Sequence, residues 1–315
     1  MQLYIRPVWW PREARRAGGH KGEADVIPAS FEYAVARDIP DAIQLLASAG
    51  GEGKVLAGGQ SLIPLMKFRL AQPAFLVDVN RISGLAQIRE NGDLRIGALV
   101  READLDTNAI VRERYPILVD TTRVIADPLV RNMATVGGNL AHADPANDHP
   151  ATMLAVRASV VARGQKGERV IPIDEFFVDT FTTVLTVDEI LTEIRIPKPP
   201  ARSGGAYLKL ERKVGDFAIA GVAVMLALDE KGKIGAVGIG VTNAGPTAIR
   251  ARKAEAILRG QSPDDKTVAA AAAAAAGESK PWSDLRGPAD YKLDMIRVLT
   301  QRAIRKAVAR ASGGK

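Results

Sequence analysis

Two pairs of glycines stand where a backbone could bind a phosphate group. Gly58 and Gly59 follow a short apolar run, and Gly137 and Gly138 follow Val136. Glycine adopts positive φ readily and lets the backbone approach a ligand without a Cβ in the way. Amides at such turns, helped by a helix N-terminus and a nearby hydroxyl, can donate hydrogen bonds to a diphosphate. The two pairs are therefore candidate diphosphate turns, and the alternative for each is an ordinary structural turn.

Polar residues next to the second pair allow two functional interpretations. His142, Asp144, Asp148 and His149 are types that ligate metal ions, but Pro145 stiffens the segment and no further ligands lie nearby in the sequence. The better functional interpretation is that Asp148 hydrogen-bonds a ribose or an adenine from a loop fixed by the proline. A turn that satisfies its own amides remains the alternative.

The composition excludes several kinds of protein. The 315 residues are 47% hydrophobic and 25% charged, which is typical of two or three compact globular units. There is no cysteine, so disulfides, a thiolate nucleophile and cysteine-ligated iron–sulfur clusters are excluded from this chain. No run approaches the roughly 18–20 apolar residues of a membrane span, and no signal-peptide pattern is present. We therefore expect a cytoplasmic protein without a transmembrane segment.

The net charge of +7 indicates little about partners by itself. Basic residues are spread along the chain, and aromatic residues are only 5%, without the basic–aromatic platform typical of nucleic-acid binding. We expect no nucleic acid partner. An acidic protein partner and a merely solvated surface are the two remaining explanations.

A β-α-β unit is predicted around the first glycine pair. Residues 54–57 form a strand pattern, Ser61 can cap a helix through residue 70, and residues 75–79 form a second buried strand. This unit would place the Gly58–Gly59 turn at the carboxyl end of a strand in a small parallel sheet. Residues 1–25 show no helical or strand period, and we expect a disordered extension there, with a partner-binding arm as the alternative.

The later segments predict a mixed unit and then a third one. Strands are expected at 94–99, 158–163 and 189–196, with helices near 101–112 and 115–124. The proline-rich residues 197–200 predict a domain boundary. After it we expect strands at 206–213, 221–228 and 234–241, and helices that include the alanine run 269–276 and the amphipathic segment 291–309.

Four segments in this order resemble the FAD-binding medium subunits of carbon monoxide dehydrogenases and related molybdenum hydroxylases. They are residues 57–62 with 66–69, 135–148, 206–218 and 283–291. The resemblance covers residues 26 to 310. It implies an α+β fold, with a PCMH-type two-part FAD-binding domain over 26–202, made of a small α/β unit and a mixed α+β unit. A small C-terminal α+β domain with an antiparallel sheet would follow over 203–312.

The resemblance also implies the residues that would bind FAD. In the first segment they are Ala57, Gly58, Gly59, Gln60, Ser61 and Leu62, and in the second Thr135, Gly137, Gly138, Asn139 and Asp148. Ile190 or Leu191 would pack near the adenine. Tyr207 would lie close to the isoalloxazine or be a core tyrosine, and Lys209 is a further candidate. No residue is expected to catalyse substrate oxidation, and no metal site is expected in this chain.

The resemblance implies partners that carry the remaining cofactors. A large subunit with a molybdenum cofactor and a small subunit with [2Fe–2S] clusters are expected, arranged as a dimer of heterotrimers, a heterohexamer. The basic residues Arg302, Arg305 and Lys306 are predicted to help dock these partners. The alternatives are a stand-alone flavin reductase or oxidase of the same superfamily and a flavin-free assembly subunit. The substrate and the terminal electron acceptor stay open.

Overall fold

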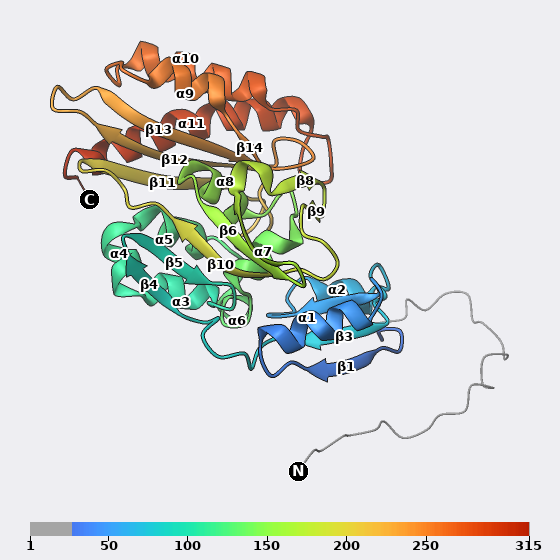
Figure 1. The fold of residues 1–315 in the computed structure, drawn as a ribbon. Coiled ribbons are helices and arrows are strands. Elements are labelled where there is room, and N and C mark those ends of the chain that lie inside the picture. The colour runs from blue at the N-terminus through green and yellow to red at the C-terminus, as the bar shows by residue number, and fades with distance from the viewer. Residues whose placement is uncertain (1–26, 315) are drawn as a thin grey trace.

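A parallel three-stranded sheet begins the part of the protein that the computed structural model describes, residues 27–314. The extension expected at residues 1–25 lies outside this part. The first unit consists of β1 (Glu32–Val35), α1 (Ile39–Ser48), β2 (Gly53–Leu56), α2 (Leu62–Lys67) and β3 (Phe75–Asp78), with strand order β1-β3-β2 (Figure 1). The predicted β-α-β unit is confirmed. Strand β1 was not predicted.

Helix α1 forms for identifiable reasons. Asp38 caps it by accepting a hydrogen bond from the Asp41 amide (2.8 Å), and Pro40 occupies the first turn, where its missing N–H is harmless. Ala42 and Leu46 face the core, and Gly50 with positive φ follows the helix end. The helix thereby covers one face of the small sheet.

The second unit is a five-stranded antiparallel sheet with helices. Its strand order is β4-β5-β10-β6-β7. The strands are β4 (Ile88–Asn91), β5 (Asp93–Gly97), β6 (Ser159–Gly164), β7 (Gly167–Pro172) and β10 (Ile190–Ile196), with the hairpin β8 (Phe177–Asp179) and β9 (Thr182–Thr183) beside it. The helices are α3 (Glu102–Thr107), α4 (Ala109–Arg114), α5 (Pro116–Arg123), α6 (Pro128–Arg131), α7 (Val136–His142) and α8 (Asp148–Ala155).

Two helix predictions for this unit need correction. The helix expected near 101–112 is split in two, because Asn108 ends α3 and its side chain caps α4 by accepting from the Val111 amide (3.2 Å). Helix α8 was not predicted, and all eight of its residues are buried. It therefore lacks the polar face by which a helix is recognised in a sequence. Asp148 is consequently the first residue of a helix rather than part of a proline-fixed loop.

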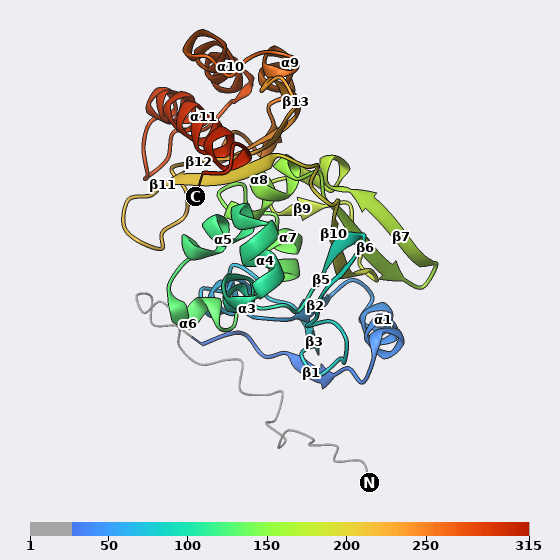
Figure 2. The same ribbon diagram turned by 90° about the vertical axis from the view of Figure 1, so that its left-hand side faces the viewer.

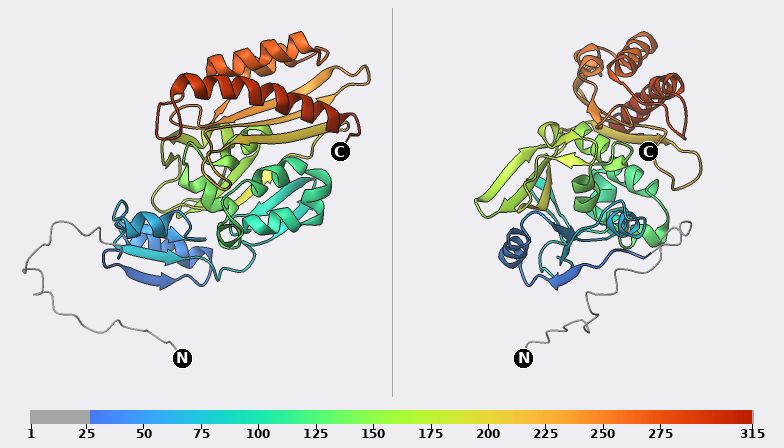
Figure 3. Two further views of the ribbon diagram at one scale, coloured as in Figure 1. Left: turned by 180° about the vertical axis from the view of Figure 1, so that it is seen from behind. Right: turned by 90° about the vertical axis from the view of Figure 1, so that its right-hand side faces the viewer.

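The third unit is a four-stranded antiparallel sheet covered by helices on one face. It contains β11 (Ser203–Leu210), β12 (Ala220–Leu228), β13 (Ile234–Thr242), β14 (Ile249–Arg250), α9 (Arg252–Leu258), α10 (Asp265–Glu278) and α11 (Ala289–Ala311). Seen from behind, α11 runs along the whole sheet, next to α10 (Figure 3). The expected α+β fold, with an antiparallel sheet in the C-terminal part, is confirmed.

Helix α8 of the second unit packs against the other face of this sheet. A Cβ on Gly240 would lie 1.9 Å from the carbonyl oxygen of Ala151, and one on Gly238 would lie 2.1 Å from that of Ala155. Only glycine permits this approach. The sheet is thus enclosed between α8 and α11, as the side view in Figure 2 shows.

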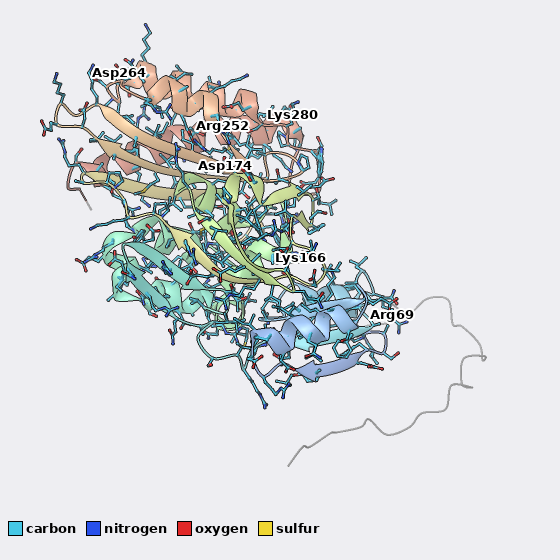
Figure 4. The ribbon with its side chains drawn as sticks, in the orientation of Figure 1. Arg69, Lys166, Asp174, Arg252, Asp264 and Lys280 are labelled. Carbon is cyan, nitrogen blue, oxygen red and sulfur yellow. The ribbon has the colours of Figure 1, made fainter. Side chains whose placement is uncertain are left out.

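Ion pairs reinforce the junction between the second and third units. Arg252 at the start of α9 donates to Asp174 at 2.6 Å, and the two side chains lie close together in Figure 4. Arg250 also contacts Asp174, at 3.2 Å. Within residues 27–314 no helix is long and apolar enough to cross a membrane.

Candidate functional site

The two glycine turns touch each other. A Cβ on Gly58 would lie 2.3 Å from the carbonyl oxygen of Met133 and 2.9 Å from the Cα of Ala134, the two residues that precede Thr135. Gly59 adopts a φ of +72°, a region that favours glycine. Two segments far apart in the sequence therefore meet through a contact that a side chain at Gly58 would prevent.

The second turn is anchored on the end of strand β5. Thr135 caps α7 by accepting from the Gly138 amide at 3.1 Å. The Gly137 amide donates to the carbonyl oxygen of Ala98 at 3.1 Å, and a Cβ on Gly137 would lie 2.6 Å from the Ala98 Cβ. Gly137 is therefore needed for packing, and Thr135 sets the start of the helix.

Polar groups around these turns have unused hydrogen-bonding capacity. The side-chain oxygen Oδ1 of Asn139 is buried and has no partner within the described residues. Ser61 makes no capping hydrogen bond to α2, so the predicted capping by Ser61 is wrong. The Gln60 amide donates back to the carbonyl oxygen of Gly58 at 3.1 Å. Buried polar groups usually find partners, so this cradle fits a polar ligand.

Two residues that the sequence analysis did not single out join the turns. Arg101 donates from Nη1 to the carbonyl oxygen of Met133 and from Nη2 to Oδ1 of Asn80 at 2.8 Å. Asn80 in turn donates to the carbonyl oxygen of Ala57 at 2.8 Å. Asn80 comes just after the carboxyl end of β3, where α/β sheets commonly place ligand-site residues. No comparable signal marks Arg101.

Asp148, Tyr207 and Lys209 form one buried cluster where α8 meets β11. The Tyr207 hydroxyl donates to Oδ1 of Asp148 at 2.5 Å, and the Lys209 ammonium donates to Oδ2 at 3.1 Å and to the carbonyl oxygen of Val124 at 2.8 Å. Asp148 is 5% exposed and Tyr207 is 3% exposed. Both carboxylate oxygens thus have partners within the chain. A contact of these three residues with a ligand stays a prediction.

Burial dominates the electrostatics of this cluster. It raises the pKa of Asp148 from 3.8 to about 6, against the opposing charge and hydrogen bond of Lys209 and the hydrogen bond of Tyr207. The pKa of Tyr207 is raised well above its usual value, chiefly by burial and then by the neighbouring Asp148 carboxylate. The phenol is therefore a neutral donor at physiological pH.

The residues of the alternative metal interpretation face different partners. Nε2 of His149 lies 2.7 Å from Oε2 of Glu102, and both side chains are fully buried. Asp148 faces Lys209 instead. The ring of His142 packs on Phe181 with 5.1 Å between centroids, and burial lowers the pKa of His142. Within residues 27–314 no three His, Cys, Asp or Glu residues are grouped so that they could hold a metal ion.

The remaining predicted residues occupy the core or an ion-pair network. Ile190 and Leu191 on β10 are 4% and 6% exposed and pack in different hydrophobic clusters. Lys306 lies 3.1 Å from Asp120 of the same chain, and Arg305 lies 2.9 Å from Asp265. Lys306 and Arg305 therefore each have an acidic partner within the chain, which weakens the docking prediction for both.

Known families match the chain over nearly all of the described part. Residues 29–199 match the family described as "FAD binding domain in molybdopterin dehydrogenase". Residues 205–307 match the "CO dehydrogenase flavoprotein C-terminal domain". The two matches meet near the proline-rich segment that separates β10 from β11.

Individual relatives are similar over their whole length. The carbon monoxide dehydrogenase medium chain of Hydrogenophaga pseudoflava is 43% identical over 288 residues, which are 91% of this chain and all of that one. The 6-hydroxypseudooxynicotine dehydrogenase complex subunit alpha of Paenarthrobacter nicotinovorans is 42% identical, over 90% of this chain and 96% of that one.

Solved structures agree with these sequence matches. A carbon monoxide dehydrogenase from Hydrogenophaga pseudoflava that lacks the Mo-pyranopterin moiety aligns with a TM-score of 0.88 and 46% identity, covering 90% of this chain and 99% of that one. Quinoline 2-oxidoreductase from Pseudomonas putida 86 aligns with a TM-score of 0.84 and 32% identity, with the same coverage.

Proposed function

Because the chain belongs to the family of FAD-binding medium subunits of molybdenum hydroxylases, we propose that it is the electron-transfer subunit of such an oxidoreductase. In this role it takes electrons from [2Fe–2S] clusters on a partner subunit and delivers them to a terminal acceptor. Bound FAD supplies the redox chemistry, and the protein supplies position and electrostatics. The absence of cysteine from the chain supports placing the clusters on a partner.

The observation that carries this proposal is the contact between the two glycine turns. Gly58 against Met133 makes a single cradle out of two distant segments, and the buried Oδ1 of Asn139 is left without a partner beside it. Such a cradle suits a ligand with a long polar centre, as the diphosphate of FAD is. Backbone amides of the two turns would supply neutral hydrogen-bond donors to that diphosphate.

The FAD contacts that we propose are those that the family resemblance implies. They are Ala57, Gly58, Gly59, Gln60, Ser61, Leu62, Thr135, Gly137, Gly138, Asn139, Asp148, Leu191, Tyr207 and Lys209. Tyr207 and Lys209 would act from the C-terminal domain together with Asp148, as one hydrogen-bonded group. We also propose residues 26–202 and 203–312 as the two domains of the subunit.

The relatives differ in the compounds that their names mention. They include medium chains or subunits named for carbon monoxide, nicotine, caffeine and glyceraldehyde. One kind of subunit thus serves enzymes for chemically unrelated compounds, which supports a substrate site on another chain. We propose a large subunit with a molybdenum cofactor and a small [2Fe–2S] subunit as partners, in a cytoplasmic dimer of heterotrimers.

The first test is FAD content. The full chain, purified with its partners, should show flavin absorbance and release about one FAD per chain. Asn139→Ala should reduce retained FAD several-fold, because it removes the unpartnered buried amide. The matched control is Asn132→Ala on the exposed end of α6, which should retain FAD as the parent protein does.

Other outcomes would favour the alternatives. A chain that binds no FAD even within its complex would be an assembly subunit, and the electron-transfer proposal would be wrong. A chain that binds FAD and oxidises a substrate alone, without partner subunits, would be a stand-alone reductase or oxidase. Size-exclusion chromatography with light scattering would test the heterohexamer separately.

A further inference from the structure

Arg101 bonds to both sides of the junction between the glycine turns. Its Nη1 donates to the carbonyl oxygen of Met133, which is the atom that faces Gly58. Its Nη2 donates to Oδ1 of Asn80 at 2.8 Å. Arginine presents several N–H donors in a rigid planar fork, so one side chain can hold two acceptors in a fixed relative position.

Asn80 extends this link to the carboxyl ends of the parallel strands. Its Nδ2 donates to the carbonyl oxygens of Ala57 (2.8 Å) and Leu56 (3.3 Å) at the end of β2. The same amide lies 2.8 Å from Oδ1 of Asp78, whose other oxygen accepts from the Tyr33 hydroxyl at 2.5 Å. Residues on all three strands of the small sheet are therefore connected, through Asn80, to one guanidinium group.

The backbone around Arg101 is fixed to the second turn. Arg101 forms a β-bridge with Thr135, and the Glu102 amide donates to the carbonyl oxygen of Ala134 at 3.0 Å. The main chain of Arg101 thus moves with the second turn, while its side chain reaches Asn80 in the small unit. The side chain is half-buried, and burial lowers the pKa of Arg101, which Asp104 and Asp78 oppose. Arginine stays protonated under these conditions.

We propose that Arg101 is a positioning residue for FAD, which holds the first glycine turn against the second at the spacing that the diphosphate requires. The inference rests on the proposed function, since it concerns the same cradle. Arg101 acts through Met133 and Asn80, and the FAD contacts named under the proposed function stay unchanged. The fold alone would tolerate a looser junction, but a ligand that spans both turns would not.

The test measures FAD affinity of the full chain in its complex, by equilibrium dialysis and released-flavin fluorescence. Arg101→Gln should weaken FAD binding at least tenfold, which equals about 1.4 kcal/mol. Asn80→Ala should weaken it to a similar degree. Arg101→Lys should be intermediate, because an ammonium reaches one of the two acceptors and not both. The matched control is Arg112→Gln, at an exposed arginine of α4 that lines a shallow pocket together with Arg310.

A double-mutant cycle separates positioning from general destabilisation. Residues that act through one contact show non-additive effects. The double variant Arg101→Gln/Asn80→Ala should therefore bind FAD about as tightly as whichever single variant binds it less tightly. Additive losses would overturn the proposal. If the parent complex binds FAD and the Arg101→Gln complex binds it equally tightly, the proposal for Arg101 is also overturned. The proposed function would stay intact in that case. A parent protein that binds no FAD would instead overturn the proposed function. If Arg101→Gln does not fold, the Arg101→Lys and Asn80→Ala variants decide by the same criteria.

Discussion

The hydroxyl of Tyr207 on β11 donates a 2.5 Å hydrogen bond to the carboxylate of Asp148 at the start of α8. This bond crosses from the C-terminal domain to the FAD-binding domain. Lys209, two residues along the same strand, holds the other carboxylate oxygen. The C-terminal domain therefore fixes a side chain of the FAD-binding domain at a position that the family resemblance assigns to the cofactor.

Tyr207→Phe should lower the free energy of unfolding by about 1–3 kcal/mol, because a buried carboxylate loses a donor. Urea unfolding of the full chain measures this change. The control is Tyr291→Phe, since Tyr291 is 42% exposed, and its effect should stay within about 0.5 kcal/mol. Equal effects of the two variants would contradict the structural importance of the Tyr207 hydroxyl.

The raised pKa of Asp148 predicts a specific pH dependence. Asp148 has a pKa of 3.8 in the unfolded chain and of about 6 in the folded chain. Its contribution to the stability of the fold is therefore complete below pH 3.8 and is lost as the pH rises through 6. The parent protein should lose on the order of 3 kcal/mol of stability relative to Asp148→Asn between pH 4 and pH 7. Paired urea titrations at several pH values measure the difference. A difference that does not change with pH would refute the prediction.

Gly58→Ala should separate the glycine turns, because the added Cβ would meet the carbonyl oxygen of Met133 at 2.3 Å. We expect retained FAD to fall at least tenfold, while the chain still assembles with its partners. Gly277→Ala is the control, since nothing apart from the neighbouring backbone of helix α10 lies within 4 Å of its Cβ position. An alanine there should leave FAD content unchanged. Normal FAD content in Gly58→Ala would show that the contact is dispensable.

Two ion pairs of α11 should differ in strength. Arg310 lies 2.6 Å from Asp120 with both side chains less than a fifth exposed, whereas Arg305 and Asp265 are 54% and 92% exposed. A double-mutant cycle on unfolding should give a coupling of about 1–3 kcal/mol for Arg310 with Asp120, whose hydrogen bonds involve charged groups. The exposed pair should give less than about 1 kcal/mol. The reverse order would contradict burial as the deciding factor.

Local patterns predicted most elements of the fold. The β-α-β unit, the strands β5, β6, β10, β11, β12 and β13 and the helices α5, α10 and α11 lie close to their expected ranges, because period and turn residues mark them. Strands β1, β4, β7, β8, β9 and β14 and helices α6 and α9 were not predicted. Helix α8 escaped prediction because every one of its residues is buried. Asn108 divides an expected helix because an asparagine can cap a new helix with its side chain as readily as it can continue the preceding one.

The site could be predicted only in its local parts. Each glycine turn is visible in the sequence as a pair of adjacent glycines. The contacts that require glycine at Gly58 and Gly137, with Met133 and Ala98, come from residues far away in the chain and are not visible there. Asn80 and Arg101 escaped prediction because their function depends on the meeting of three segments in space. The Glu102–His149 pair is similar, since 47 residues separate the partners and neither has a local signal.

The close packing of α8 on the glycines of β13 limits where this subunit can be cut into separate domains. Gly238 and Gly240 bring the C-terminal sheet into direct contact with the backbone of Ala151 and Ala155. A fragment ending near residue 202 would expose that face of α8 to water and leave Asp148 without Tyr207 and Lys209. A chimera that exchanges the C-terminal domain between two relatives would therefore have to carry α8 along with the sheet. In evolution, substitutions on α8 and on the facing strand β13 are therefore expected to occur together.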